Sequence, residues 1–213
     1  MGITANHLIE LFQQIADAMG REKEYLTELD GAIGDSDHGI TMKLGFDEAS
    51  RAVTQLKTSS PSPSEVLEAA ASAFLDAVGA STGPLYATAF KSASQALQGV
   101  QILTTNDQVN LLEAIVSGIQ KRGRATRGEK TMLDAWIPAV EAAHLALENN
   151  LSTAQMWETV ASAGEAGAQD TATMTATKGR AARLGERSLG HKDPGAESAA
   201  IILRTMANCF AQK

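Results

Sequence analysis

The chain contains one cysteine, Cys209, among its 213 residues, so it has no internal disulfide. It also lacks any apolar run approaching the roughly 18 residues that a membrane-spanning helix needs. No basic segment followed by an apolar stretch marks the N-terminus as a secretory signal. These absences lead us to expect a soluble, cytoplasmic protein whose cysteine is a small core side chain.

Aromatic residues are scarce, at 4%, although hydrophobic residues make up 44% and alanine is abundant. That hydrophobic share is enough for a globular core, and small side chains favour helices packed closely on one another. Basic residues are outnumbered, which gives a net charge of -7 and an isoelectric point near 5.1. An acidic chain is a poor partner for nucleic acid or for an anionic membrane surface.

Strand patterns are missing too, because apolar and polar residues do not alternate over strand lengths and β-branched runs are rare. Apolar residues instead recur at helical spacing between short segments of glycine, proline or serine. The pattern predicts helices at about residues 4–19, 21–29, 39–57, 62–78, 84–97, 106–120, 133–148, 153–175 and 194–210. Short connections imply antiparallel neighbours in a bundle or closed ring. Residues 58–63 are expected to be a plain linker, so residues 1–213 are expected to form a single all-α domain.

Three aspartates lie within eight residues and are interspersed with glycines: Asp30, Asp35 and Asp37. Carboxylates this close repel one another unless a cation or water separates them. Oxygen ligands of this kind suit Mg²⁺ or Ca²⁺ rather than zinc or copper. The twelfth residue counted from Asp30 is Thr41 rather than Glu, which excludes an EF-hand loop. A loop with few carboxylates favours Mg²⁺ shared with substrate phosphates, while a solvated acidic turn is the simpler alternative.

Three other segments have the composition of anion-binding loops at helix boundaries, namely residues 78–85, 128–134 and 178–195. In the first, Ser81 and Thr82 precede a helix start, where free backbone N–H groups and the helix dipole attract anions. In the second, Thr131 is a candidate cap. The third contains Arg180 and Arg187, whose planar side chains can bind phosphate. Each segment alone is also compatible with ordinary caps, turns and surface ion pairs.

Alternate connections of an antiparallel bundle emerge at the same end. The aspartate segment and the three other segments are therefore expected to gather at one rim. Acidic metal ligands, helix N-termini and arginines together fit a Mg²⁺–nucleotide complex. The sequence thus predicts a nucleotide site at one end of the fold.

Four motifs carry a resemblance to a known family: Leu29-Asp-Gly-Ala-Ile-Gly-Asp-Ser-Asp-His-Gly39, Gly79-Ala-Ser-Thr-Gly-Pro-Leu85, Gly128-Glu-Lys-Thr-Met132 and the segment from Lys178 to Gly195. Their order and spacing resemble those of the nucleotide-binding L subunit of dihydroxyacetone kinase, over essentially the whole chain. The same domain forms the C-terminal part of single-chain, ATP-dependent dihydroxyacetone kinases. The resemblance implies an eight-helix antiparallel up-and-down barrel with the nucleotide at one end.

By this resemblance, Asp30, Asp35 and Asp37 hold two Mg²⁺ ions that bridge the phosphates of ADP or ATP. The resemblance also places these residues around the nucleotide: His38, Thr41, Ser81, Thr82, Gly123, Met132, Arg180, Asp193, Pro194 and Gly195. The glycine loop of the family often reads Gly-Gly-Ala-Ser-Gly, whereas here it reads Gly-Ala-Ser-Thr-Gly, in which Thr82 keeps a hydroxyl group. No nucleophile or general base is expected on this chain.

In the family, a separate K subunit holds the ketose, so this chain is expected to be inactive alone. In one version a phosphohistidine-carrying M subunit of the phosphotransferase system rephosphorylates resident ADP, and in the other ATP exchanges in each cycle. The sequence leaves open which version applies, which ketose is used, and the oligomeric state, a homodimer included. Two other functions stay open: a regulatory module that contacts a transcription regulator, and a structural helical adaptor.

Overall fold

Most of the chain is helical in the computed structural model, which describes residues 2–56, 60–79, 81–211 and 213. The helices are α1 (Ala5–Ile33), α2 (His38–Thr54), α3 (Pro63–Ala77), α4 (Thr82–Ala96), α5 (Thr105–Gly123), α6 (Leu133–Glu148), α7 (Thr153–Asp170) and α8 (Pro194–Phe210). Two 3₁₀ segments, η1 (Thr171–Thr173) and η2 (Ala181–Ser188), lie between α7 and α8. Two short strands, β1 (Ile3–Thr4) and β2 (Ile102–Leu103), pair antiparallel.

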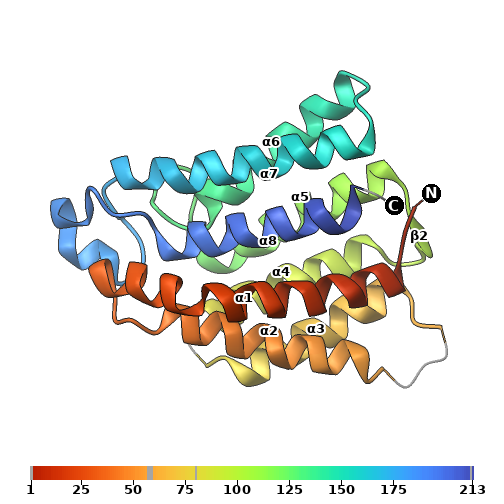
Figure 1. Ribbon diagram of the computed structural model, residues 1–213, viewed down its shortest axis with the longest axis horizontal. Helices are drawn as coiled ribbons and strands as arrows, with labels where there is room; N and C mark the ends of the chain where they lie inside the picture. Colours follow the sequence, from red (N-terminus) through yellow and green to blue (C-terminus); the bar gives the residue numbers. More distant parts are fainter. Residues whose placement is uncertain (1, 57–59, 80, 212) are drawn as a thin grey trace.

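The helices form a closed ring. Each helix packs against the next along the chain, and α8 packs back against α1. Their axes follow the long direction of the molecule, so the connections fall at its two ends (Figure 1). The all-α, up-and-down arrangement expected from the sequence is confirmed.

The N-terminal helix differs from its prediction. The sequence predicted two pieces and an aspartate loop, but α1 runs unbroken for 29 residues and carries Asp30 in its last turn. Thr4 begins the helix with a capping box, in which His7 Nδ1 accepts from the Thr4 backbone N–H. Gly20 did not interrupt the helix because packing of its buried face outweighs the roughly 1 kcal/mol cost of a helical glycine.

Several boundaries also differ from the predictions. The paired strands β1 and β2 were not predicted, since two residues are too few for an alternating pattern. Helix α7 ends at Asp170 and is followed by a 3₁₀ turn, and the segment predicted to be irregular contains η2. The predicted helix end at Lys57 and linker positions Thr58 and Ser59 lie outside the described residues, as does Ala80 of the glycine loop.

The scarce aromatic residues are concentrated in one part of the core. Phe46 packs edge-on against the rings of Phe74, Tyr86 and Phe90, at centroid distances of 5.2, 5.9 and 6.1 Å. Gly45 allows this approach, because a Cβ atom there would collide with the Phe74 ring. Elsewhere alanine fills the helix contacts, as the composition indicated. Among the described residues, no helix combines the length and apolar character needed to span a bilayer.

Candidate functional site

A cavity of about 680 Å³ opens at one end of the ring, where four connections meet. It is lined by the segments that the sequence predicted to gather there, together with the ends of α1 and α5 and the starts of α2, α4, α6 and α8. The predicted site residues that line it are Asp30, Asp35, Asp37, His38, Ser81, Thr82, Gly123, Met132, Arg180, Asp193, Pro194 and Gly195. Two residues singled out from the sequence do not line it: Thr41, in the first turn of α2, and the exposed Arg187.

The three aspartates converge although they come from different local structures. Asp30 projects from the last turn of α1, Asp35 lies in the turn between the helices, and Asp37 precedes α2. One ligand oxygen from each lies within 4.8 Å of the others. Asp30 Oδ2 accepts hydrogen bonds from the backbone N–H groups of Asp37, at 2.9 Å, and His38, at 3.2 Å. The carboxylate of Asp30 therefore also caps α2 and fixes the turn between the helices.

The turn between α1 and α2 is shaped by small residues. A Cβ atom at Gly34 would collide with the Asp30 carboxylate, so a larger residue there would displace that side chain. Ser36 has a φ of 63°, in the left-handed region that non-glycine residues seldom adopt. Burial, and then the negative charge of Asp30, raise the pKa of the Asp37 carboxyl above its ordinary value. Three hard oxygen donors held together in this way fit a divalent cation such as Mg²⁺.

Arg180 brings a positive charge to the aspartates from the distant segment before η2. Its guanidinium forms an ion pair with Asp35, and its Nη1 lies 3.7 Å from Asp37 Oδ2. Since the side chain remains 57% exposed, it is free to turn toward another anion at the cavity. The sequence predicted Arg180 in the site, but its pairing with these aspartates required the fold.

His38 faces inward at the start of α2. It is 8% exposed, and its Nε2 lies 2.9 Å from Ser198 Oγ on α8. Burial lowers the pKa of His38 to about 4, against the opposing effects of the Asp30 charge and a hydrogen bond with the backbone of Pro194. The imidazole is therefore neutral at pH 7 and acts as a polar wall of the cavity rather than as a charge.

Two further aspartates near the cavity accept hydrogen bonds from backbone N–H groups near helix starts. Asp134 is buried and accepts from the backbone N–H groups of Gly128, at 2.5 Å, and Thr131, at 2.8 Å. Asp193 caps α8 by accepting from the Ala196 N–H at 2.7 Å. Although residue Asp193 keeps some solvent contact, its carboxyl group is enclosed by protein, and this burial raises its pKa to about 7. The predicted cap Thr131 accepts a longer bond, at 3.2 Å from the Leu133 N–H.

Sequence reasoning did not single out several lining residues, among them the buried Lys130. It is 1% exposed, and its φ of 59° is in the left-handed region. Arg122, Lys178 and the apolar Leu85 and Ile119 also line the cavity. No local pattern marks them, because each reaches the site from a helix end or loop that tertiary packing places there.

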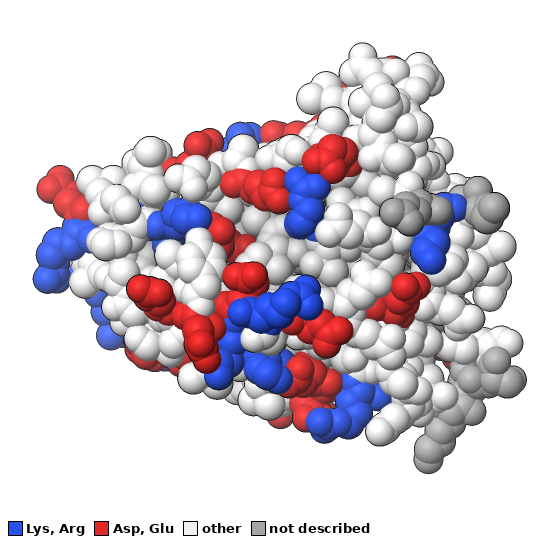
Figure 2. Space-filling view, in the orientation of Figure 1, with Lys and Arg blue, Asp and Glu red and all other residues white. Residues whose placement is uncertain are grey.

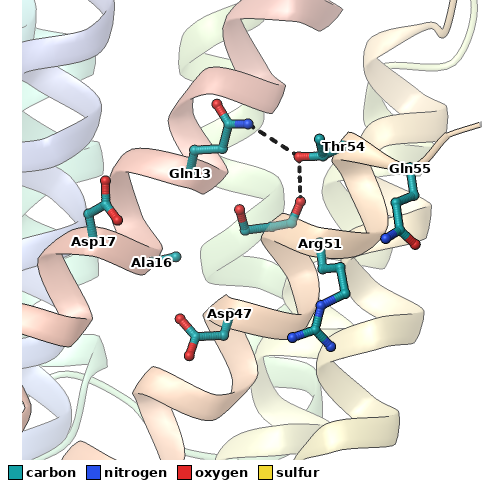
Figure 3. Close-up of a pocket in the computed structure, with 8 residues that line it drawn as sticks. Gln13, Ala16, Asp17, Asp47, Arg51, Thr54 and Gln55 are labelled. Atoms are coloured by element: carbon teal, nitrogen blue, oxygen red, sulfur yellow. Dashed lines mark hydrogen bonds between the residues drawn. The ribbon is translucent and has the colours of Figure 1, made fainter.

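A second, shallower depression lies between α1 and α2, away from the aspartates (Figure 3). Polar side chains line it, including Asp17, Asp47 and Arg51. Gln13 Nε2 donates to Thr54 Oγ1 at 3.3 Å, and Lys43 pairs with Asp47. These are ordinary contacts between exposed helix faces, and within the part of the chain that the structure describes no group of converging metal ligands lies at this depression. On the face shown in Figure 2, acidic and basic side chains are mixed rather than segregated into a basic patch.

In a comparison with known protein families, a family model described as the DAK2 domain matches residues 32–208 of this chain. The chain belongs to the DAK2 domain family. A relative from Escherichia coli K12, the PEP-dependent dihydroxyacetone kinase, ADP-binding subunit DhaL, is 38% identical over 97% of this chain and 98% of its own length. The PTS-dependent dihydroxyacetone kinase, ADP-binding subunit DhaL, of Lactococcus lactis subsp. lactis is 35% identical over 98% of this chain and its full length.

Solved structures share the fold. The dihydroxyacetone kinase from C. freundii, in complex with AMP-PNP and Mg²⁺, matches with a TM-score of 0.71 and 23% identity. The match covers 98% of this DAK2 chain but only 34% of that longer protein. The fold of this DAK2 chain therefore matches about one third of that longer kinase chain.

Proposed function

We propose that this DAK2 protein is the Mg²⁺–nucleotide-binding subunit of a dihydroxyacetone-type kinase, a phosphotransferase that acts on dihydroxyacetone or a related ketose. One observation carries the proposal, namely that Asp30, Asp35 and Asp37 converge beside Arg180 in a cavity of about 680 Å³. A cavity of this size suits a nucleotide. Full-length relatives named as ADP-binding subunits of dihydroxyacetone kinases support the assignment.

The aspartates are the proposed ligands of two Mg²⁺ ions. Bound Mg²⁺ supplies charge neutralisation of the nucleotide phosphates, which is the main requirement of phosphoryl transfer. The chain contributes the preorganisation, since the backbone N–H groups of Asp37 and His38 hold the Asp30 carboxylate in place. Asp35 is exposed and can reorient, so we propose that it exchanges Arg180 for metal when nucleotide binds.

Phosphate groups are proposed to lie against the start of α4. Ser81 and Thr82 begin this helix and line the cavity, and the free N–H groups of a first helical turn are suited to binding an anion. Arg180, once released from Asp35, is the proposed partner of the terminal phosphate. This placement keeps the phosphates next to the aspartates.

The rest of the nucleotide is proposed to lie along the opposite side of the cavity. Gly123 ends α5 there, Met132 is a buried apolar side chain, and Asp193, Pro194 and Gly195 form the start of α8. Thr41 was also predicted to contact nucleotide, but it lies in the first turn of α2 and is not among the residues that line the cavity. We propose no direct role for it.

The partner that holds the ketose is proposed to dock at the same end of the ring. Phosphoryl transfer needs the acceptor oxygen close to the terminal phosphate, so a K subunit must approach the aspartates. Ile40 and Leu44, in the first two turns of α2 next to them, are 55% and 46% exposed. We propose these apolar side chains as part of the docking surface, with ADP rephosphorylated by an M subunit in the PTS-dependent version.

The docking proposal is tested by coelution with a K subunit. Replacing Ile40 and Leu44 by Asp should abolish coelution and leave nucleotide binding unchanged. The matched control is Leu145→Asp on α6, which removes a residue of similar exposure, 57%, from another part of the surface. Coelution that survives the double replacement would place the interface elsewhere.

The nucleotide assignment is tested by calorimetry. Titration of the purified protein with ADP should release or absorb heat in the presence of Mg²⁺ and not in excess EDTA, and ligand should raise the thermal midpoint. Mass spectrometry of the freshly purified protein under native conditions then distinguishes the two versions, since resident ADP survives purification and exchanging ATP does not. An absence of heat and of thermal stabilisation would favour a structural adaptor.

A further inference from the structure

Lys130 is an unusual residue for the wall of a nucleotide cavity. Lysine is seldom fully buried, yet Lys130 is 1% exposed and lines the cavity between α5 and α6. Its φ of 59° is a conformation that non-glycine residues seldom adopt and that is strained for them. Such strain persists only where surrounding contacts compensate for it.

The compensating contacts are three hydrogen bonds from one ammonium group. Nζ of Lys130 donates to the backbone carbonyls of Thr171 at 2.6 Å, Met174 at 3.2 Å and His191 at 2.5 Å. The first two carbonyls lie after α7, and the third lies just before α8. One side chain thus joins the loop entering α6 to both ends of the long connection between α7 and α8.

Neighbouring contacts join the same three segments. Thr177 N–H donates to the Glu129 carbonyl at 3.3 Å, and Lys178 Nζ lies 3.5 Å from Glu129 Oε1. Gly190 N–H donates to the Ala172 carbonyl at 2.8 Å. Together with the Lys130 bonds, these contacts connect the three segments to one another. The connected segments include Met132, Arg180 and the Asp193–Gly195 turn.

A lysine in a nucleotide site is ordinarily expected to contact phosphate. An ammonium group has three donors, and all three of these donors are directed to backbone carbonyls here. Burial lowers the pKa of the Lys130 ammonium, and the nearby negative charges of Asp193 and Asp134 oppose this shift. A phosphate contact would require breaking at least one carbonyl bond in a buried site, which is unfavourable.

We propose that Lys130 is a positioning residue whose ammonium holds the cavity-forming loops together before nucleotide arrives, and that it does not bind phosphate. The expected effect on nucleotide affinity rests on the proposed function. The ordering of the loops by Lys130 does not. Its consequence is a cavity wall that is already ordered in the nucleotide-free protein. The free energy of nucleotide binding is then not reduced by the conformational entropy lost when these loops become ordered.

The structural part is tested by hydrogen exchange of the wild-type protein without nucleotide. The backbone amides of Gly190 and Asp193, which donate to the Ala172 carbonyl and to Thr171 Oγ1, should be protected to a degree similar to helix α6. Exchange of these two amides at the rate of an unstructured chain would overturn the proposal. This measurement requires neither a variant nor a ligand.

The functional part is tested with Lys130→Met, which keeps the length of the side chain and removes its donors. ADP affinity should fall about tenfold, because only a fraction of molecules then has the loops in the binding-competent arrangement. The dependence of affinity on salt concentration should stay that of the wild type. A flattened salt dependence would instead identify a lost phosphate contact and overturn the proposal, as would unchanged ADP affinity.

Lys91→Met is the matched control, because it removes an exposed lysine of α4 that lies 3.9 Å from Glu68 and away from the cavity. It should leave ADP affinity unchanged. If the wild-type protein itself fails to bind ADP, the proposed function fails, and hydrogen exchange compared between the wild type and Lys130→Met still decides whether Lys130 orders the loops. The failure of one conclusion is thus distinguishable from the failure of the other.

Discussion

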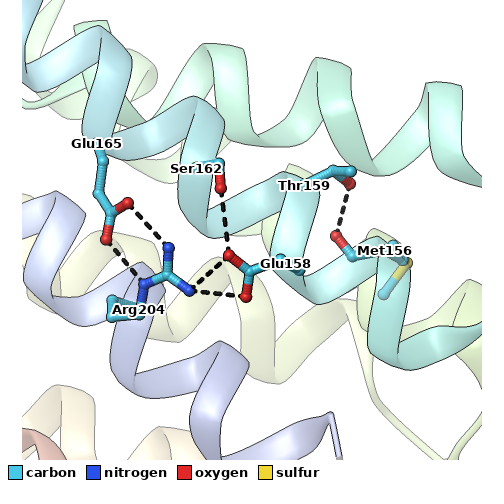
Figure 4. A network of polar contacts seen from close by, with 6 residues as sticks. All are labelled: Met156, Glu158, Thr159, Ser162, Glu165 and Arg204. Carbon is cyan, nitrogen blue, oxygen red and sulfur yellow. Dashed lines mark hydrogen bonds and ion pairs between the residues drawn. The ribbon is translucent and has the colours of Figure 1, made fainter.

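Two arginines in this molecule each lie between two carboxylates, and their surroundings are opposite. Arg204 on α8 donates to Glu165 through Nε and Nη2, both at 2.8 Å, and to Glu158 through Nη1 at 2.9 and 3.0 Å (Figure 4). Every partner is on α7, one helix away. Arg180 instead precedes η2 and reaches Asp35 and Asp37, which lie far from it in the sequence.

The difference lies in how completely each arginine satisfies its carboxylates. Hydrogen bonds from Arg204 fill both oxygens of Glu165 and Glu158, and they raise the pKa of Arg204 and lower that of Glu158. Around Arg180, two of the three clustered carboxylates pair with one guanidinium, and the pKa of Asp37 is raised rather than lowered. A satisfied network joins two helices, whereas an excess of clustered carboxylate is a reason to expect a further cation.

The largest effect is expected from breaking the acidic cluster. Asp35→Ala should lower the affinity for Mg²⁺–ADP by at least about 100-fold, since it removes a proposed metal ligand, and it should leave the fold intact because Asp35 is exposed. Calorimetry measures the affinity and circular dichroism the fold. Glu165→Ala, the equivalent change in the Arg204 network, should leave ADP affinity unchanged. Wild-type affinity in Asp35→Ala would contradict the metal assignment.

A smaller effect with two opposite signs is expected for Arg180→Ala. Loss of the proposed phosphate partner should weaken ADP binding about tenfold. The same change removes a cation that competes for Asp35 and Asp37, so Mn²⁺ binding without nucleotide, followed by electron paramagnetic resonance, should become tighter. Arg204→Ala should change neither value. If both ADP and Mn²⁺ bound more weakly to Arg180→Ala, the exchange of arginine for metal would be wrong.

For the Arg204 network the expected effect is on stability alone. Because Arg204 is 31% exposed, solvent screens its ion pairs and their contribution is modest. Arg204→Ala should lower the thermal midpoint by about 2–4 °C, the shift that a change of ~1 kcal/mol produces in a domain of this size. High salt should reduce the difference between variant and wild type. A much larger loss would mean that packing of the arginine stem against α7, rather than charge, holds these helices together.

The same two regions show what could be predicted from the sequence. Local signals predicted most of the helices, the helix starting at Pro194, and the aspartates as a cluster. Alternation of helix direction predicted that their loops would share one end. These predictions succeeded because periodicity, caps and connection lengths are properties of short segments.

What escaped prediction depends on contacts between distant segments. The burial of Lys130 is set by carbonyls 41 to 61 residues away, and the pairing of Arg180 with Asp35 also joins separate parts of the chain. Asp30 was expected in a loop, but tertiary packing extends α1 through it, so that its carboxylate caps the next helix. Thr41 was placed at the site by resemblance, and in the first turn of α2 it does not line the cavity.

The smallest net effect is expected from pH, in protein free of metal and nucleotide. The Arg204 network should not change the stability between about pH 5 and 7, because glutamate side chains ordinarily titrate near pH 4 and arginine above about pH 12. In the site, His38 has its pKa lowered to about 4, so the unfolded chain alone takes up its proton as pH falls below 6.5, which destabilises the fold. Asp193 has its pKa raised to about 7, so the folded chain alone keeps its proton as pH rises above 3.8, which also destabilises the fold.

These two contributions have opposite slopes and largely cancel between about pH 4 and 6.5 in the wild type. Urea unfolding across this range should therefore show little change. Asp193→Asn keeps an acceptor for the helix cap and removes the Asp193 titration. Only the His38 contribution then remains of the two, so stability should rise with pH up to about 6.5. In His38→Gln only the Asp193 contribution remains of the two, so stability should fall as pH rises toward about 7. Parallel pH profiles in the two variants would show that the buried groups of the site titrate no differently from the exposed network.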